Sequence, residues 1–209
     1  METLKVVVLI SGRGSNLKAI IDKCSKKSVP AKVVAIISNN KNASGLKLSG
    51  KFKKIIINDL DKKKFEIKLH NNLKKLKPDL ICLAGFMKVL SSFIIKKWRN
   101  KIINVHPSLL PLFKGLNTHQ RALDSGVKKS GCTIHFVDET LDGGPIILQA
   151  STTIDKNITS EELSKKILKI EHKIYPEVVS LIAKNQISLK NNKVLIKNRE
   201  KVNSFLKKI

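Results

Sequence analysis

The chain has 209 residues, of which 42% are hydrophobic, and it carries a formal net charge of +25 at pH 7. This length suits one α/β domain with a sizeable core, and the hydrophobic content argues against a disordered chain. The sequence has neither a run long enough to span a membrane nor the features of a secretory signal, and its three cysteines lie far apart, so we expect a cytoplasmic protein without disulfides or a zinc site.

Apolar stretches alternate with helical patterns along the first half of the chain. Strands are predicted at residues 5–10, 32–38, 54–58 and 79–84, and helices at residues 16–26 and 61–76. The first and fourth strands leave no polar face, which is typical of strands covered on both sides. We therefore expect an α/β fold with a mostly parallel sheet, helices on both faces and ligands at the carboxyl ends of the strands.

A Gly-rich loop, Ser11-Gly12-Arg13-Gly14-Ser15-Asn16, follows the first strand and leads into the first helix. Glycines let backbone N–H groups approach an anion, and a helix N-terminus adds the positive end of its dipole. Leu17 stands where a dinucleotide-binding loop would have its third glycine, and no Walker lysine follows. The loop therefore favours a monophosphate over a nucleotide, although a tight turn with a purely structural role has the same local pattern.

Further along, Ile102 and Ile103 indicate the end of a buried strand, which places Asn104 and His106 on the same side where the chain leaves the sheet. Asp142 lies on a Gly-rich turn between two further predicted strands, residues 133–137 and 146–150. An amide, an imidazole and a carboxylate of this kind suggest an oxyanion donor, a proton shuttle and a group that keeps the shuttle charged. The set predicts an acyl-transfer site.

The last part of the chain is predicted to hold a long helix. It starts at Thr159, where Thr159-Ser160-Glu161-Glu162 forms a capping box, and it continues with apolar residues on one face. The Lys-rich tail, residues 185–209, contains a short strand at residues 194–196, and we expect its end to be frayed.

Taken together, these segments resemble the folate-dependent phosphoribosylglycinamide formyltransferases of purine biosynthesis, over residues 6–176. The motifs that carry the resemblance are Ile10-Ser11-Gly12-Arg13-Gly14-Ser15-Asn16, Ala84-Gly85-Phe86-Met87-Lys88-Val89-Leu90, Asn104-Val105-His106-Pro107-Ser108-Leu109-Leu110-Pro111, Leu141-Asp142-Gly143-Gly144-Pro145 and Glu171-His172-Lys173-Ile174-Tyr175-Pro176. The resemblance implies formyl transfer from 10-formyltetrahydrofolate to the primary amine of 5-phosphoribosylglycinamide, without a metal.

The resemblance also implies roles for individual residues. Gly14, Ser15 and Asn16 would clamp the phosphate and ribose, and Glu171 would contact the polar end of the glycinamide substrate. The residues implied to face the folate are Lys62, Met87, Lys88, Val89, Leu90 and Asn104. Lys62 stands where the family commonly has an arginine, so it keeps the charge and loses the bidentate fork.

The implied chemistry agrees with the residues at the predicted acyl-transfer site. Attack of an amine on a formyl carbon creates an oxyanion, for which Asn104 and a protonated His106 are the donors. Asp142 favours the charged imidazole and helps to order the water that relays the proton. Thr133 and His135 share one face of the preceding strand, and His135 is a candidate to support the site.

The resemblance implies one formyltransferase domain over residues 1–209, Rossmann-like in its N-terminal half. Residues 1–100 would form the phosphate-binding half, and residues 101–209 the folate-binding and catalytic half. We expect a monomer or weak homodimer. Two alternatives stay open, a methionyl-tRNA formyltransferase and a formyltetrahydrofolate hydrolase. The first would need a C-terminal RNA-binding module, for which about thirty residues after the long helix are too few, and the second would carry an extra N-terminal regulatory domain.

The positive charge raises a further alternative, a noncatalytic nucleic-acid-binding protein. Only four of the 41 basic residues are Arg, aromatic residues make up 4% of the chain, and the lysines spread over several predicted helix faces. Nucleic-acid-binding surfaces place cations in one stripe with stacking rings among them. We therefore attribute the lysines to compositional bias, with a steering effect on anionic small substrates, and expect no specific nucleic-acid partner.

Binding to nonspecific RNA or DNA is accordingly expected to be weak and to collapse between low and physiological salt, because contacts with phosphates alone depend on counterion release. Fluorescence anisotropy of a labelled oligonucleotide over a salt series measures this. A defined RNA held at physiological salt with sequence preference would contradict the expectation.

Overall fold

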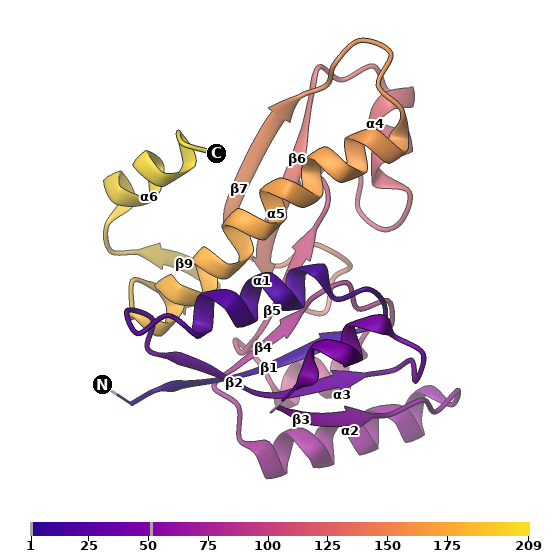
Figure 1. The fold of residues 1–209 in the computed structure, drawn as a ribbon, viewed down its shortest axis with the longest axis vertical. Coiled ribbons are helices and arrows are strands. Elements are labelled where there is room, and N and C mark those ends of the chain that lie inside the picture. The colour runs from indigo at the N-terminus through magenta and orange to yellow at the C-terminus, as the bar shows by residue number, and fades with distance from the viewer. Residues whose placement is uncertain (1, 51) are drawn as a thin grey trace. The chain divides into compact units, whose positions relative to one another are not determined.

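The computed structural model describes residues 2–50 and 52–209 (Figure 1). The chain divides into two compact units, one ending at Asn104 and the other starting at Val105. The halves expected from the sequence meet at residue 100, close to this boundary.

The first unit is built on parallel strands. Its strands are β1 (Leu4–Ile10), β2 (Ala31–Ser38), β3 (Lys53–Ile56), β4 (Leu80–Leu83) and β5 (Ile102–His106), of which β5 ends in the second unit. They pair in the order β3-β2-β1-β4-β5, and every one of these pairs is parallel. This order matches the first five strands of the doubly wound order 3-2-1-4-5-6, and the parallel pairing agrees with the predicted sheet.

Helices cover both faces of this parallel sheet. Helices α1 (Ser15–Cys24) and α2 (Lys62–Leu76) lie on opposite faces (Figure 1), as right-handed crossovers to either side of β1 require. Strand β1 is buried from Val6 to Ile10, and α2 buries Phe65, Leu69 and Leu73 along one stripe. Two short elements escaped prediction, the 3₁₀ helix η1 (Ser44–Ser49) and helix α3 (Ser92–Lys97).

The second unit contains an antiparallel strand pair and a long helix. Strands β6 (Lys129–Phe136) and β7 (Ile146–Thr153) pair antiparallel and complete a seven-stranded sheet whose order is β3-β2-β1-β4-β5-β6-β7. Helix α5 (Ser160–Ala183) packs against β6, β7 and the short helix α4 (Thr118–Asp124). The mostly parallel sheet with helices on its faces confirms the predicted fold class.

The capping box at the start of α5 is present as predicted. The Thr159 hydroxyl accepts from the Glu162 N–H at 3.2 Å, and the Glu162 carboxylate accepts from the Thr159 N–H at 2.9 Å. The short strand predicted at residues 194–196 is confirmed as part of β9 (Lys193–Ile196), which forms a hairpin with β8 (Ile187–Lys190). The end that was expected to be frayed contains the helix α6 (Arg199–Leu206). The Asn198 side chain caps α6 by accepting from the Lys201 N–H at 3.0 Å.

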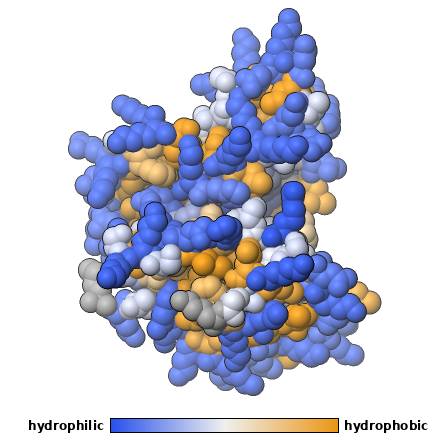
Figure 2. All heavy atoms as spheres, in the orientation of Figure 1, coloured by the Kyte–Doolittle hydropathy of each residue, from blue (hydrophilic) through white to orange (hydrophobic). Residues whose placement is uncertain are grey.

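The visible surface is hydrophilic in many separate places and not along a single band (Figure 2). Apolar side chains show between the hydrophilic ones.

Among residues 2–50 and 52–209, no helix has both the length and the apolar character that crossing a membrane requires.

Gly131→Ala should destabilise the protein, because a Cβ at this position of β6 would lie 2.1 Å from the Ala150 carbonyl oxygen on β7. Backbone cannot give way cheaply in a paired strand, so we expect a loss of at least about 1–3 kcal/mol in the free energy of unfolding. Urea denaturation measures the loss. Gly12→Ala is the matched control, since a Cβ there meets nothing within 4 Å, and equal midpoints for the two variants would contradict the prediction.

Candidate active site

The candidate catalytic residues begin on β5. Asn104 and His106 both lie within this strand, two positions apart, so their side chains leave the same face, as predicted. The strand is longer than the sequence suggested, since it includes both residues instead of ending before them. His106 is only 4% exposed, which means that its ring polar atoms need partners inside the protein.

Both ring nitrogens of His106 face an oxygen atom. Nδ1 lies 3.3 Å from the Asp142 Oδ2 atom, and Nε2 lies 2.9 Å from the Phe113 carbonyl oxygen. A carbonyl oxygen can only accept, so Nε2 carries a proton and donates to Phe113. When Nδ1 is also protonated, the ring forms an ion pair with Asp142, and this geometry suits the charged imidazole.

A tight turn presents the Asp142 carboxylate to His106. Asp142 has a left-handed backbone with φ +46°, a conformation that Asp adopts more readily than most residues. Its Oδ2 atom also accepts from the Gly115 N–H at 2.9 Å. A Cβ on Gly144 would lie 2.0 Å from the Phe136 carbonyl oxygen, so the turn needs glycine there. The sequence prediction that Asp142 joins His106 is thus met in geometry, while its catalytic role stays a prediction.

His135 lies on the other side of the same carboxylate. Its Nε2 atom is 3.8 Å from the Asp142 Oδ1 atom, too far for a hydrogen bond, and its Nδ1 donates to the Phe136 carbonyl oxygen at 2.9 Å. Burial lowers the pKa of His135 below its ordinary value of 6.5, against the opposing effects of the Phe136 carbonyl and the Asp142 charge. Burial thus favours the neutral form of His135, and the nearer imidazole to the Asp142 carboxylate is that of His106.

A buried polar network fixes the loop that follows His106. The Thr133 hydroxyl donates to the Ser108 carbonyl oxygen at 2.7 Å and accepts from the Leu110 N–H at 3.0 Å. Gln149 Nε2 donates both to Thr133 Oγ1 and to the Leu110 carbonyl oxygen. Sequence reasoning missed Gln149, although a polar residue facing Thr133 across the β6–β7 pair was the available signal.

Two other histidines and Glu171 lie in the second unit. Burial and the nearby His106 lower the pKa of His119, and burial lowers the pKa of His172. Glu171, on α5, is 6% exposed. Burial raises the pKa of the Cys132 thiol on β6, and the Glu171 charge raises it further, so this carboxylate lies near β6. Its predicted contact with substrate stays a prediction.

The Gly-rich loop forms the start of α1 in the first unit. Gly14 is the N-cap residue with φ +76°, no side chain caps this end, and the first turn contains no acidic residue. A Cβ on Gly14 would lie 2.7 Å from the Gly45 Cα atom, and the Gly45 N–H donates to the Gly12 carbonyl oxygen at 3.0 Å. The helix end next to Ser15 and Asn16 therefore has the positive potential that attracts an anion.

The residues implied to face the folate differ in accessibility. Met87 and Val89 are 67% and 63% exposed, while the Leu90 side chain is buried in the core. Lys88 Nζ donates to the Asp59 carbonyl oxygen at 3.0 Å, so its amine already has a partner. Lys62 is exposed at the first position of α2. Met87 and Val89 thus offer open apolar surface, whereas the Leu90 side chain does not, and the contact of these residues with a folate stays a prediction.

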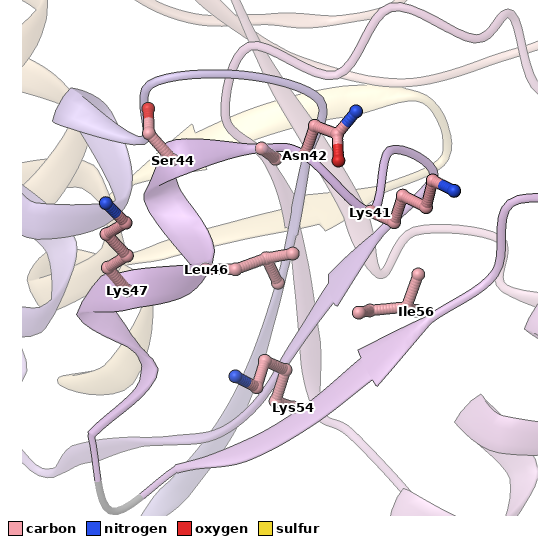
Figure 3. A pocket seen from close by; sticks show the side chains of 8 residues that line it. Lys41, Asn42, Ser44, Leu46, Lys47, Lys54 and Ile56 are labelled. Atoms are coloured by element: carbon pink, nitrogen blue, oxygen red, sulfur yellow. The ribbon is translucent and has the colours of Figure 1, made fainter.

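A pocket of about 370 Å³ also opens in the first unit, around η1. Figure 3 shows Leu46 and Ile56 in its middle, while the amine groups of Lys41, Lys47 and Lys54 turn outward in different directions. Binding sites usually place a few polar groups so that they converge on one ligand. This pocket lacks that convergence and contains none of the predicted site residues.

Curated relatives share most of this chain. The phosphoribosylglycinamide formyltransferase of Haemophilus influenzae is 41% identical over 196 residues, which cover 90% of this chain and 91% of that protein. The enzyme of the same name from Escherichia coli is 36% identical over 90% of this chain and 92% of that protein. The trifunctional purine biosynthetic protein adenosine-3 of Bos taurus is 42% identical over 90% of this chain, but the chain spans only 19% of that protein.

Solved structures and a family model give the same result. The glycinamide ribonucleotide transformylase 1 of Symbiobacterium toebii superposes with a TM-score of 0.89 at 37% identity, covering 94% of this chain and 95% of that chain. The phosphoribosylglycinamide formyltransferase of Anaplasma phagocytophilum superposes with a TM-score of 0.88 at 41% identity and the same coverage. Residues 4–179 match the family model described as formyl transferase. The chain therefore belongs to the formyl transferase family.

Proposed function

We propose that this protein transfers the formyl group of 10-formyltetrahydrofolate to the amine of 5-phosphoribosylglycinamide, a step of de novo purine biosynthesis. The observation that carries the proposal is the buried His106 ring held against Asp142, on the same strand as Asn104. The two bacterial relatives that the chain covers almost from end to end bear the name of this reaction. We expect the reaction to take place in the cytoplasm and to need no metal.

The proposed reaction needs hydrogen-bond donors for an oxyanion and a group that balances the charge of the imidazole. The amine attacks the formyl carbon, so a new C–N bond forms and the carbonyl oxygen becomes an oxyanion. The Asn104 amide and an N–H of His106 donate to that oxygen, and Asp142 balances the charge of the imidazole. The ammonium then loses a proton through a water near Asp142, the folate nitrogen gains a proton, and its bond to the formyl carbon breaks.

The contact between His106 and Phe113 places a condition on this mechanism. The Nε2 proton is engaged by the Phe113 carbonyl oxygen at 2.9 Å. Asp142 holds the other nitrogen, so donation to the oxyanion requires the segment around Phe113 to release Nε2. Gly115, two residues further on, donates to Asp142, so the same segment contacts both members of the catalytic pair.

The ligands are assigned by chemistry. The phosphate is held by the Gly14 loop with Ser15 and Asn16, where the helix end carries no cap. Glu171 binds the glycinamide end. The folate lies against Met87 and Val89, whose neighbouring backbone groups read the polar edge of its ring. The uncapped α1 terminus favours a small phosphorylated acceptor over transfer RNA or water.

His106→Ala and Asp142→Asn should each reduce kcat by roughly 10²- to 10⁴-fold, since both residues act on charge that develops during the reaction. The apparent KM values should change much less. Folate release in a coupled spectrophotometric assay measures both constants, and circular dichroism checks the fold. Asp124→Asn is the matched control, because that carboxylate is exposed and bonded to Gln120 on α4. Turnover close to wild type in either site variant would remove the assignment.

Ser15→Asp should raise the apparent KM of the phosphorylated substrate about tenfold. The reason is that a carboxylate at the start of α1 repels the negatively charged phosphate. The KM of the folate should change little. Replacement of Gly14 is a poorer test, since the added side chain would collide with the Gly45 backbone. Ser160→Asp, at the first position of α5, is the matched control. Equal weakening of both ligands would show that the loop has only a structural role.

A further inference from the structure

Ser11 connects two loops that are distant in the sequence. It follows β1 and begins the Gly-rich loop, yet its backbone N–H donates to the Gly85 carbonyl oxygen at 3.1 Å. Its hydroxyl accepts from the Met87 N–H at 2.8 Å. Both contacts reach the segment after β4 that carries the exposed Met87 and Val89 side chains.

Neighbouring groups fix the orientation of the Ser11 hydroxyl. It donates its single proton to the Asn39 Oδ1 atom at 2.6 Å, just after β2. With that proton committed, the lone pairs of the hydroxyl are left for the Met87 N–H. Asn40 Nδ2 donates to the Ser11 carbonyl oxygen at 3.1 Å, so the residue is held from the β2 side through both backbone and side chain.

The far end of the segment from Gly85 to Ser91 has a different anchor. The Glu66 carboxylate on α2, which is buried, accepts from both the N–H and the hydroxyl of Ser91. On the same helix, the Phe65 ring stacks on Phe86 with 6.2 Å between the ring centroids. The segment is therefore tied to α2 near both ends, at Phe86 and at Ser91. Ser11 ties the same segment to the Gly-rich loop through its bonds to Gly85 and Met87.

We propose that Ser11 is a positioning residue that couples the Gly-rich loop (residues 11–16) to the segment carrying Met87 and Val89. A ligand bound to the loop then raises the affinity of the segment for its own ligand, and the reverse. The inference rests on the proposed function, which assigns phosphate to the first loop and folate to the second. A phosphate bound by the amides after Gly14 restrains residues 12–16 and, through the backbone, Ser11. The Ser11 bonds then restrain Gly85 and Met87, so the second ligand orders a segment that is already less mobile.

Thermodynamic reciprocity makes the coupling measurable from either ligand. In the wild-type protein, a saturating phosphorylated substrate should lower the dissociation constant of the folate by roughly fivefold, the lower end of typical coupling between sites. Ser11→Ala removes the hydroxyl bond to Met87 and keeps the backbone bond to Gly85, so it should bring that ratio well below the wild-type value. Glu66→Gln weakens the other anchor, so it should weaken folate binding while leaving the ratio intact.

Hydrogen–deuterium exchange tests the coupling without any turnover. Inorganic phosphate is added until exchange slows in the peptide covering residues 12–17, and exchange is then followed in the peptide covering residues 85–91. We expect the second peptide to slow in the wild-type protein and in Glu66→Gln. In Ser11→Ala, phosphate should slow the first peptide as before and the second peptide clearly less than in the wild-type protein. Ser11→Thr, which retains a hydroxyl, should restore the response of the second peptide.

Each outcome decides between the two proposals. If the second peptide responds to phosphate as strongly in Ser11→Ala as in the wild-type protein, or fails to respond in the wild-type protein, the coupling through the Ser11 hydroxyl is overturned, whatever the turnover assay shows. Slowing in neither peptide of the wild-type protein would remove the phosphate site and the coupling together. If phosphate slows both wild-type peptides but no formylated product forms, the proposed reaction fails and the coupling stands.

Discussion

The His106 ring lies between the Asp142 carboxylate and the Phe113 carbonyl oxygen, and the candidate site depends on these two contacts. A buried imidazolium costs several kcal/mol unless an opposite charge and hydrogen-bond acceptors surround it. Asp142 Oδ2 at 3.3 Å and the Phe113 carbonyl oxygen at 2.9 Å meet that requirement. The left-handed turn at Asp142 places its two carboxylate oxygens toward two imidazoles, with the shorter distance to His106. Charge at this point is what the proposed oxyanion requires.

The first unit contributes binding surface through backbone geometry more than through charged side chains. The Gly14 loop lies against Gly45 so closely that neither position accepts a side chain, and this contact fixes the uncapped start of α1. Met87 and Val89 project from a segment anchored by Ser11 and Glu66. These hydrogen bonds place the candidate ligand-binding groups, while the many lysines remain on the surface. Specificity would thus reside in a few fixed positions, and the net charge would affect the rate of encounter.

Features with a local signature were predictable from the sequence. The apolar run of β1, the capping box of Thr159 and the alternation that pairs Asn104 with His106 follow from neighbouring residues alone. The short helices η1 and α3 were missed because six residues do not establish a helical period. The α6 helix was missed because a Lys-rich tail resembles a frayed end.

Features that depend on distant contacts were not predictable. Leu90 belongs to a motif that suggested a pocket wall, but packing turns its side chain into the core. The Phe113 carbonyl oxygen reaches His106 because Phe113 has a left-handed backbone conformation. No sequence pattern predicts that conformation for a phenylalanine. The Ser11 bond joins residues 76 positions apart, and Gln149 supports a loop 39 positions away. Such contacts are fixed by the fold as a whole.

The most direct test of the account is a competition for one labelled formyl group. The protein is mixed with 10-formyltetrahydrofolate carrying ¹³C in the formyl group, together with phosphoribosylglycinamide and methionyl-tRNA in water, and the fate of the label is followed by NMR. The account predicts that the ¹³C signal moves to the formamide of the phosphorylated glycinamide. A signal that appears instead as formate or as formylmethionyl-tRNA would contradict it.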